Sequence, residues 1–344
     1  MNKLNIDKSY IFAGILVVLM CLVPSVISKP YYLHVIIICM LWAYLASCWN
    51  IIGGFAGQLS LGHAIYTAVG AYVTIMLFNT LGLSPWIGLF IAGGIAAVLS
   101  LIIGFPTFGL RGAYYALATV AISEGIVVLI NNTKNLGNFL VGGAEGLIVK
   151  SVGNSWAAIQ FHSKIPYYYI ILVMLVMIVI LARWIKESKL GYYLVALRED
   201  EDAAAAMGID VRKQKLIAGA ISAFFTALGG VFYALLIRYL EPNAIAGASM
   251  STQMVFLTIV GGAGTVIGPV IGGLLLSFLS EMIRFYLGGQ LMGLHLFIYG
   301  MIVLLMIIFQ PKGLAELIDK AKGLIMKKKQ IKGGESGVKD ASGA

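Results

Sequence analysis

Residues 166–185 read PYYYIILVMLVMIVILARWI, a run of twenty residues that carries a single charge, Arg183. A helix of about 20 apolar residues is long enough to cross the hydrocarbon core of a bilayer. Tyrosines at its start and Trp184 near its end are typical of the two membrane–water interfaces. This stretch therefore predicts a transmembrane helix.

The composition of the whole chain points the same way. Of the 344 residues, 60% are hydrophobic and 11% are charged, whereas soluble domains carry roughly 25% charged residues. A water-soluble globule could not cover so much apolar surface. This excludes a soluble enzyme, a nucleic-acid-binding protein and a disordered chain, so the net charge of +9 does not indicate a nucleic-acid partner.

Similar apolar runs recur along the sequence and predict an all-α polytopic membrane protein with about ten transmembrane helices, within a range of eight to ten. The eighth run is short and interrupted by glycine. A signal peptide is the alternative for the first run, and its cleavage would leave nine spans. The predicted spans are 10–28, 31–52, 63–80, 85–105, 111–131, 166–185, 216–238, 250–263, 266–287 and 291–309.

The basic residues predict how these spans are oriented. With the N-terminus in the cytoplasm, 18 Lys and Arg residues fall inside and six fall outside, as the positive-inside rule requires. Both termini are then cytoplasmic in a bacterial cell membrane. The predicted parts are a cytoplasmic N-terminus (1–9), a transmembrane domain (10–309) with an external loop (132–164) and a cytoplasmic coupling loop (186–215), and a basic, partly disordered cytoplasmic tail (310–344).

Glycine interrupts two of the predicted membrane segments, near 53–63 and 261–269. The first reads GGFAGQLSLGH and places Gln58, Ser60 and His63 at membrane depth. Interrupted backbone cannot face lipid, so it is buried in protein or lines a wet cavity. In transporters, paired interruptions mark the translocation pathway, which we expect these three side chains to line; close helix packing through small residues is the alternative.

Glu124 lies deep in the fifth predicted span. A carboxylate at that depth is costly unless it is paired or hydrated, so we expect it to face the pathway; a structural hydrogen bond to a neighbouring helix is the alternative. Tyr114 and Thr119 of the same span are further pathway candidates, and Asn50 of the second span is a candidate for interhelical hydrogen bonding.

The predicted internal loop contains LREDEDAAAAMGI at 197–209. Its four alanines favour a helix, its acidic start suits the positive end of the helix dipole, and its glycine can end the helix. So short a helix has little stability alone, and its small side chains allow another protein to approach closely. The predicted contact residues are Glu201, Asp202, Ala203, Ala204 and Gly208.

Several sequence signals of chemistry are missing. There is no GxxxxGK[ST] phosphate-binding loop, no CxxC pair and no HExxH, and Cys21, Cys39 and Cys48 all lie within apolar runs. We therefore expect no catalytic site, metal or cofactor on this chain.

The internal helix also carries a family resemblance. The pattern Asp202-Ala203-Ala204-x-x-x-Gly208 resembles the EAA motif of ABC-importer permeases, with Asp202 where that motif usually has Glu and without its later Ile-x-Leu-Pro part. The whole stretch 196–210 resembles the branched-chain amino-acid ABC transporter permeases of the LivM type. Other blocks that resemble this family are GQLSLGHA (57–64), LRGAYYALAT (110–119), GGAEGL (142–147), GGAGT (261–265) and FQPKGL (309–314).

This resemblance implies a membrane-spanning subunit of an ATP-driven importer that works by alternating access, most simply for branched-chain amino acids. It implies three kinds of protein partner besides the lipid bilayer, and no nucleic acid. The helix at 199–208 would contact an ATPase. The implied partners are a homologous permease subunit, two ATP-binding subunits that hydrolyse ATP, and an extracytoplasmic solute-binding protein.

Two alternatives stay open. Urea and short-amide importers share these sequence blocks, so the substrate is less well defined than the class. An ion-coupled secondary transporter, with His63 and Glu124 as a proton relay, is a different class, but it gives the internal helix no partner on which to dock.

Overall fold

The computed structural model describes residues 19–25, 29–287, 294–310, 313, 314 and 316. Its long helices are α2 (Pro30–Asn50), α3 (Ala64–Leu81), α4 (Pro85–Thr107), α5 (Ala113–Asn132), α6 (Ile165–Glu187), α7 (Lys189–Glu199), α9 (Val211–Ile237), α11 (Ala248–Gly262), α12 (Gly268–Leu287) and α13 (Leu294–Phe309), with short helices α8 (Glu201–Ala206) and α10 (Pro242–Ala246).

The prediction of an all-α polytopic membrane protein is confirmed. Within the described residues, eight helical segments are long and apolar enough to cross a bilayer. The predicted span 250–263 is longer than expected, because α10 and α11 together form an apolar segment from Pro242 to Gly262. Most of the predicted span 10–28 lies outside the described residues, as do 1–9 and most of 310–344. The predicted span 291–309 corresponds to α13, whose 16 residues are too few for it to count among the eight segments.

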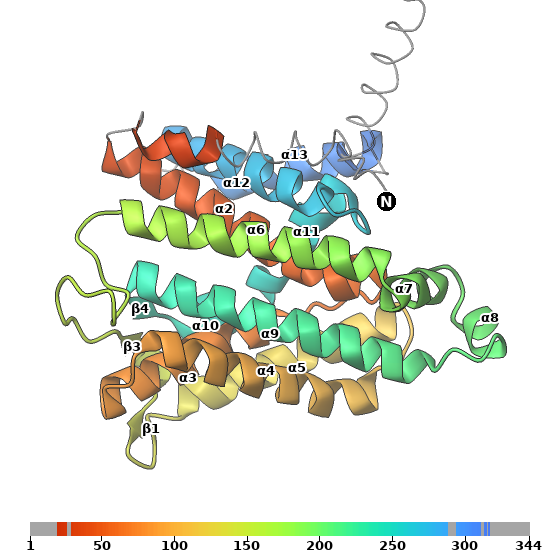
Figure 1. The fold of residues 1–344 in the computed structure, drawn as a ribbon, viewed down its shortest axis with the longest axis horizontal. Coiled ribbons are helices and arrows are strands. Elements are labelled where there is room, and N and C mark those ends of the chain that lie inside the picture. Colours follow the sequence, from red (N-terminus) through yellow and green to blue (C-terminus); the bar gives the residue numbers. More distant parts are fainter. Residues whose placement is uncertain (1–18, 26–28, 288–293, 311–312, 315, 317–344) are drawn as a thin grey trace, which may run out of the picture.

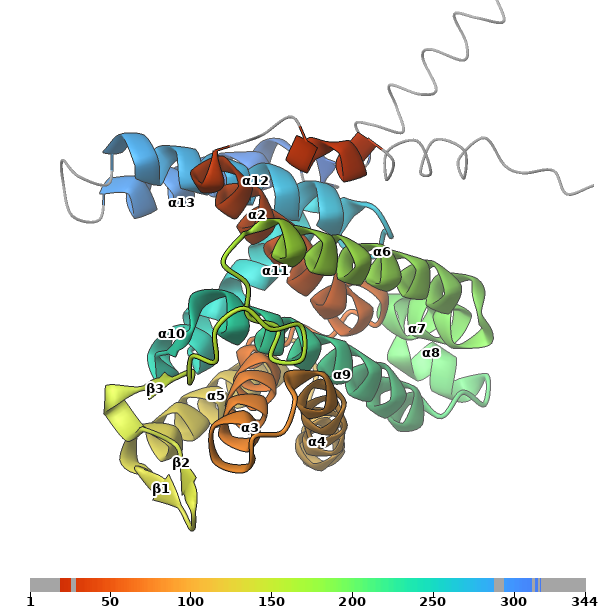
Figure 2. The same ribbon diagram turned by 60° about the vertical axis from the view of Figure 1, so that its left-hand side comes forward.

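The long helices lie side by side along one direction and form two groups (Figures 1 and 2). One group holds α2, α6, α11, α12 and α13, and the other holds α3, α4, α5, α9 and α10. Helix α2 is the most deeply buried of the candidate spans, and it contacts α6, α9, α11 and α12. It therefore joins the two groups.

Several glycines serve close helix packing. A Cβ on Gly70 of α3 would lie 2.0 Å from the carbonyl oxygen of Ala227, and one on Gly230 of α9 would lie 2.0 Å from that of Thr67. Such contacts are possible only without side chains, and they draw the backbones of α3 and α9 together. The alternative interpretation of glycine as a packing residue thus applies between these helices.

The connecting segments gather at two opposite ends of the helices (Figure 1). The hairpin end holds β1 (Asn135–Leu136), which pairs antiparallel with β2 (Phe139–Leu140), and β3 (Leu147–Ile148), which pairs antiparallel with β4 (Tyr239–Leu240). The α8 end holds α7 and α8. The segments 132–164 and 186–215 therefore lie at opposite ends of the helices.

Candidate translocation site and its link to helix α8

The first glycine break interrupts the path from α2 to α3. Helix α2 continues into a π-helix at Ile51–Phe55, and irregular backbone follows until Ala64. A Cβ on Gly53 would lie 2.2 Å from the indole of Trp49, so the chain can turn here only without a side chain. Wide helical turns of this kind occur mostly at functional sites.

The second break lies between α11 and α12, and it touches the first. Gly264 has φ +76, which favours glycine. Asn50 joins the two segments: its Nδ2 donates to the carbonyl oxygen of Thr265 at 2.8 Å, and its Oδ1 accepts from the backbone N–H of Gly264 at 2.9 Å. The predicted interhelical hydrogen bonding of Asn50 thus connects the two glycine breaks.

Buried side chains satisfy the irregular backbone of the first break. The Trp49 indole N–H donates to the carbonyl oxygen of Ser60 at 2.8 Å, and the N–H of Leu61 donates to Thr119 Oγ1 at 3.1 Å. The N–H of Ala64 donates to Ser251 Oγ at 2.8 Å. These backbone groups are therefore satisfied by protein, as irregular backbone at membrane depth requires.

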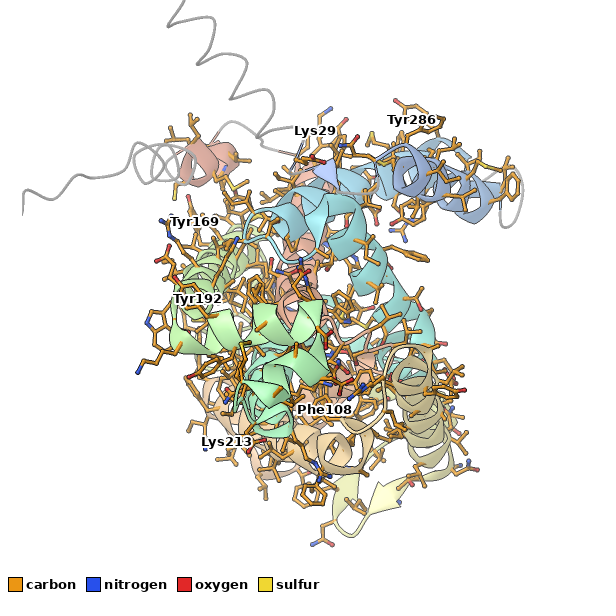
Figure 3. All side chains as sticks on the ribbon, turned by 90° about the vertical axis from the view of Figure 1, so that its right-hand side faces the viewer. Lys29, Phe108, Tyr169, Tyr192, Lys213 and Tyr286 are labelled. Atoms are coloured by element: carbon orange, nitrogen blue, oxygen red, sulfur yellow. The ribbon has the colours of Figure 1, made fainter. Side chains whose placement is uncertain are left out.

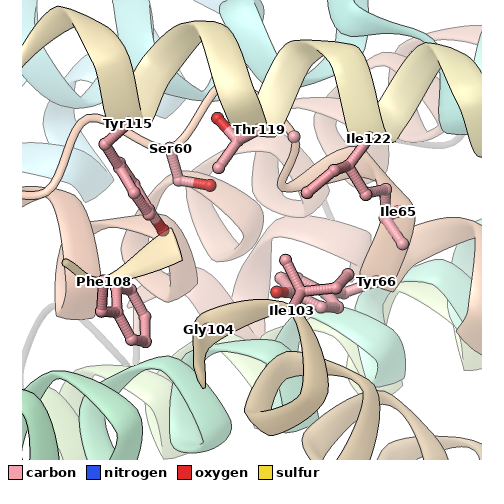
Figure 4. A pocket seen from close by; sticks show the side chains of 10 residues that line it. Ser60, Ile65, Tyr66, Ile103, Gly104, Phe108, Tyr115, Thr119 and Ile122 are labelled. Atoms are coloured by element: carbon pink, nitrogen blue, oxygen red, sulfur yellow. The ribbon is translucent and has the colours of Figure 1, made fainter. Parts of the chain in front are cut away.

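The six predicted pathway residues fall into separate environments. Ser60 and Thr119 line a small cavity with Tyr66, Phe108 and Tyr115, and Figure 4 shows Ser60 of the first break beside Tyr115 and Thr119 of α5, with Phe108 and Tyr66 on the opposite side. About 10 Å³ is open to the centre of a water molecule, which is room for about one water. In this conformation the cavity cannot admit an amino acid.

His63 lies in the core rather than on an open path, with 1% of its surface exposed. Its Nε2 lies 2.9 Å from Ser222 Oγ and 3.1 Å from Thr226 Oγ1. Both hydroxyls already donate to backbone carbonyl oxygens, so we assign the proton to Nε2 as the shared donor. His63 thereby ties the start of α3 to α9.

Tyr114 and Glu124 lie on the open side of α5. Tyr114 is 74% exposed, and Glu124 is also exposed while its Oε1 accepts from the N–H of Ala248 at 3.1 Å. Ala248 is the first residue of α11, where a carboxylate stabilises the helix dipole. Glu124 therefore makes a structural hydrogen bond to a neighbouring helix and still faces outward.

Gln58 belongs to the α8 end. It lies in an open polar cleft of about 220 Å³ and donates from Nε2 to Glu201 Oε1 at 3.0 Å. Gln58 itself is 5% exposed. The first break thus has one residue, Gln58, in direct contact with the first residue of α8.

Local hydrogen bonds explain why α8 forms. The Asp200 carboxylate accepts from the N–H groups of Asp202 and Ala203 at 2.9 and 3.0 Å, which is an N-cap. Gly208, with φ +86, follows the end of the helix, as its sequence position suggested. The short helix predicted within 197–209 is therefore present.

Charged side chains fix α8 to the rest of the protein. Glu201 Oε1 lies 2.6 Å from Lys215 Nζ of α9, and the Lys215 side chain is 0% exposed. Arg111, which precedes α5, donates two hydrogen bonds to Asp202, at 2.6 and 2.8 Å, and lies 3.5 Å from Glu201. The hydrogen bond and charge of Arg111 lower the pKa of Asp202.

The predicted contact residues of α8 do not share one face. Asp202, Ala203 and Gly208 are exposed, whereas Ala204 is 1% exposed and packs in the core of this chain. Ala206 and Met207, which sequence reasoning did not single out, are exposed as well. Figure 3 looks onto this end, with Tyr192 of α7 and Lys213 of α9 around α8. Ala203, Ala205, Ala206 and Met207 therefore form the exposed apolar part of α8 and its end, while Ala204 packs against the rest of the chain.

Sequence reasoning did not single out Lys215, Arg111 or Arg198 as site residues: it counted all three as cytoplasmic charges, and Arg111 and Arg198 otherwise only lay within blocks that resemble the family. The available signal was the position of Lys215, at the start of an apolar span and 14 residues after an acidic cluster. Among the described residues, no group of three His, Cys, Asp or Glu side chains is placed to hold a metal ion.

These features define a class: a multi-pass membrane permease with interrupted helices in its core and a short helix fixed at one end. The family model for the permease component of branched-chain amino acid transport systems matches residues 31–309. The chain belongs to this family.

Curated relatives agree with this assignment. The chain is similar to the high-affinity branched-chain amino acid transport system permease protein LivM of Escherichia coli K12, with 28% identity over 89% of this chain and 75% of the relative. It is also similar to the LivM of Salmonella typhimurium LT2, 26% identical over the same shares, and to a probable LivM of Methanocaldococcus jannaschii, 23% identical over 76% and 80%. No solved structure gives a significant match.

Proposed function

We propose that this chain is the membrane-spanning subunit of an ATP-driven importer whose substrates are branched-chain amino acids, and that it moves them by alternating access. Family membership over 31–309 carries the class, and the branched-chain amino acid transport for which the relatives are named supports the substrate. The two joined glycine breaks supply segments that can rearrange, which alternating access requires.

The α8 end is the cytoplasmic end in this proposal. The basic residues of 186–215 lie there, and the positive-inside rule places them in the cytoplasm of a bacterial cell. Both termini then also lie in the cytoplasm. The hairpin end faces outward, where a solute-binding protein would deliver its substrate.

Two ATP-binding subunits supply the energy, one of them against α8 of this chain. The exposed Ala203, Ala206 and Met207 offer a small apolar surface, and the exposed carboxylate of Asp202 borders it. A groove with an apolar floor and basic rim would fit this surface. Because Glu201 contacts both Lys215 and Gln58, movement of α8 would reach the core.

A homologous permease subunit covers the open side of α5. Only 28% of the most apolar part of this helix is buried within the chain, and Glu124 is the twelfth of its twenty residues. A carboxylate near mid-helix cannot face lipid cheaply. We therefore place the pathway between α5 and the partner permease, where Glu124 would attract the ammonium group of an amino acid in passage.

Reconstitution tests this function. The chain is co-expressed with its neighbouring permease and ATP-binding subunits, placed in liposomes, and supplied with the solute-binding protein and labelled leucine, isoleucine, valine or urea. We expect uptake of the branched-chain amino acids that requires ATP and is unaffected when ion gradients are collapsed. Uptake of urea alone would favour the amide importer, and uptake driven by an ion gradient without ATP would favour a secondary transporter.

A further inference from the structure

The end of α7 reaches directly into the place where the two glycine breaks meet. Arg198, the second-last residue of α7, donates from Nη1 to the carbonyl oxygen of Gly54 at 3.1 Å. Gly54 belongs to the first break. Asn50, one helical turn before Gly54, accepts a hydrogen bond from the backbone N–H of Gly264 in the second break. One guanidinium therefore lies against both interrupted segments.

Two glycines, Gly57 and Gly264, leave room for this side chain, and a third, Gly54, lets the two breaks approach each other. A Cβ on Gly57 would lie 2.7 Å from Arg198 Cγ, and one on Gly264 would lie 2.1 Å from Arg198 Nη1. A Cβ on Gly54 would lie 2.6 Å from the backbone nitrogen of Gly264. Any side chain at these positions would displace the arginine or separate the breaks. These glycines therefore do more than interrupt helices: Gly57 and Gly264 make room for Arg198, and Gly54 allows close contact with Gly264.

The same arginine lies close to α8 in the chain, because only Asp200 separates α7 from α8. It stands two residues before Asp200, whose side chain caps α8. The next residue, Glu199, lies 3.4 Å from Arg198 Nη2 and is exposed at the α8 end. A displacement of α8 toward or away from the bilayer must move the Arg198 backbone, and the side chain must then either pull on Gly54 and Gly264 or leave its slot.

We propose that Arg198 is a positioning residue that transmits the movement of α8 to both glycine breaks at once, so that the two interrupted segments rearrange together. It touches neither substrate nor ATP. This inference rests on the proposed function, because the movement of α8 comes from the ATP-binding subunits. It goes beyond that function by naming the side chain through which the two breaks are coupled.

The test uses the complete importer complex in liposomes. Arg198→Met keeps an extended apolar stem but removes the donor to Gly54, and Lys189→Met is the matched control. Lys189 is an exposed cation at the first position of the same helix, and its loss makes the same charge change. We expect Arg198→Met to lower substrate uptake per ATP hydrolysed at least tenfold, and Lys189→Met to leave this ratio within twofold of the unchanged complex.

A thiol-labelling readout separates transmission from general damage. With the native Cys21, Cys39 and Cys48 replaced, cysteine is placed either at Leu59, an exposed residue of the first break, or at Ala206 on α8. In the unchanged complex, ATP with vanadate should alter the labelling rate at both positions. In Arg198→Met it should still alter the rate at Ala206→Cys but no longer at Leu59→Cys.

The outcomes are distinct. Normal uptake per ATP in Arg198→Met, or a retained response at Leu59→Cys, would overturn the inference while the importer itself still works. Failure of both Arg198→Met and Arg198→Lys to assemble would overturn it in favour of a purely structural arginine. Absence of ATP-dependent uptake in the unchanged complex would instead refute the proposed function.

Discussion

Replacing Lys215 by methionine should destabilise the protein by about 2 kcal/mol. Methionine keeps much of the apolar stem but leaves Glu201 without the ammonium group that lies 2.6 Å away. Breaking a buried ion pair costs about 3–5 kcal/mol. Here the loss is smaller because Glu201 is 17% exposed and keeps Arg111 at 3.5 Å and the hydrogen bond from Gln58.

A double-mutant cycle measures this pair. The free energy of unfolding is determined by SDS titration in mixed micelles for Lys215→Met, Glu201→Gln and the double variant. The double variant leaves neither charge unpaired, so we expect a coupling energy of about 1–2 kcal/mol. The exposed Lys213, two residues away on α9, is the control: Lys213→Met should change stability by less than about 0.5 kcal/mol.

Two results would refute this reasoning. One is a Lys215→Met variant that loses no more stability than Lys213→Met. The other is strict additivity of the two single changes, which would mean that the buried ammonium group and the Glu201 carboxylate do not depend on each other.

Three further predictions concern the site. Ala206→Trp should block ATP-driven uptake in membrane vesicles while the chain stays folded. Ala204→Trp should instead overpack the core and lower the free energy of unfolding by about 1–3 kcal/mol or more. Equal protease resistance of the two variants would contradict this. Glu124→Gln should assemble but take up substrate slowly, and normal uptake with poor assembly of Glu124→Ala would make it structural. Arg111 lowers the pKa of Asp202 below its ordinary 3.8. The ion pair therefore stabilises α8 above pH 3.8, and this stabilisation is lost only as pH falls through the lowered pKa. Protease resistance of α8 should thus stay constant from pH 5 to 8, and a decline within that range would argue against the pair.

Local physics made much of the fold predictable. Spans such as 166–185 can be recognised in the sequence because a helix that crosses a bilayer requires about 20 consecutive apolar residues, whatever the rest of the chain does. Helix α8 is equally local: Asp200 caps it by accepting from N–H groups two and three residues later, and Gly208 follows its end. The glycine breaks were visible for the same reason, since a backbone propensity acts within a few residues.

The predicted site was only partly accessible to such reasoning. Apolar composition does not state which face of a membrane helix meets lipid and which meets protein. Thus the sequence placed Ser60, His63 and Glu124 at membrane depth, but their environments differ: a small cavity, the core and the open side of α5. Ala203 and Ala204 are neighbours of identical chemistry, yet one is exposed and the other is buried.

Residues close together in the chain thus suffice to predict the class of protein, most of the described spans, the two breaks and the short helix. The tertiary structure decided the pairing of Lys215 with Glu201, the bridge of Asn50 between the two breaks, and the seat of Arg198 against Gly54 and Gly264. These contacts join residues up to 215 positions apart. Their energies depend on distance and burial, which only the packing of the helices sets.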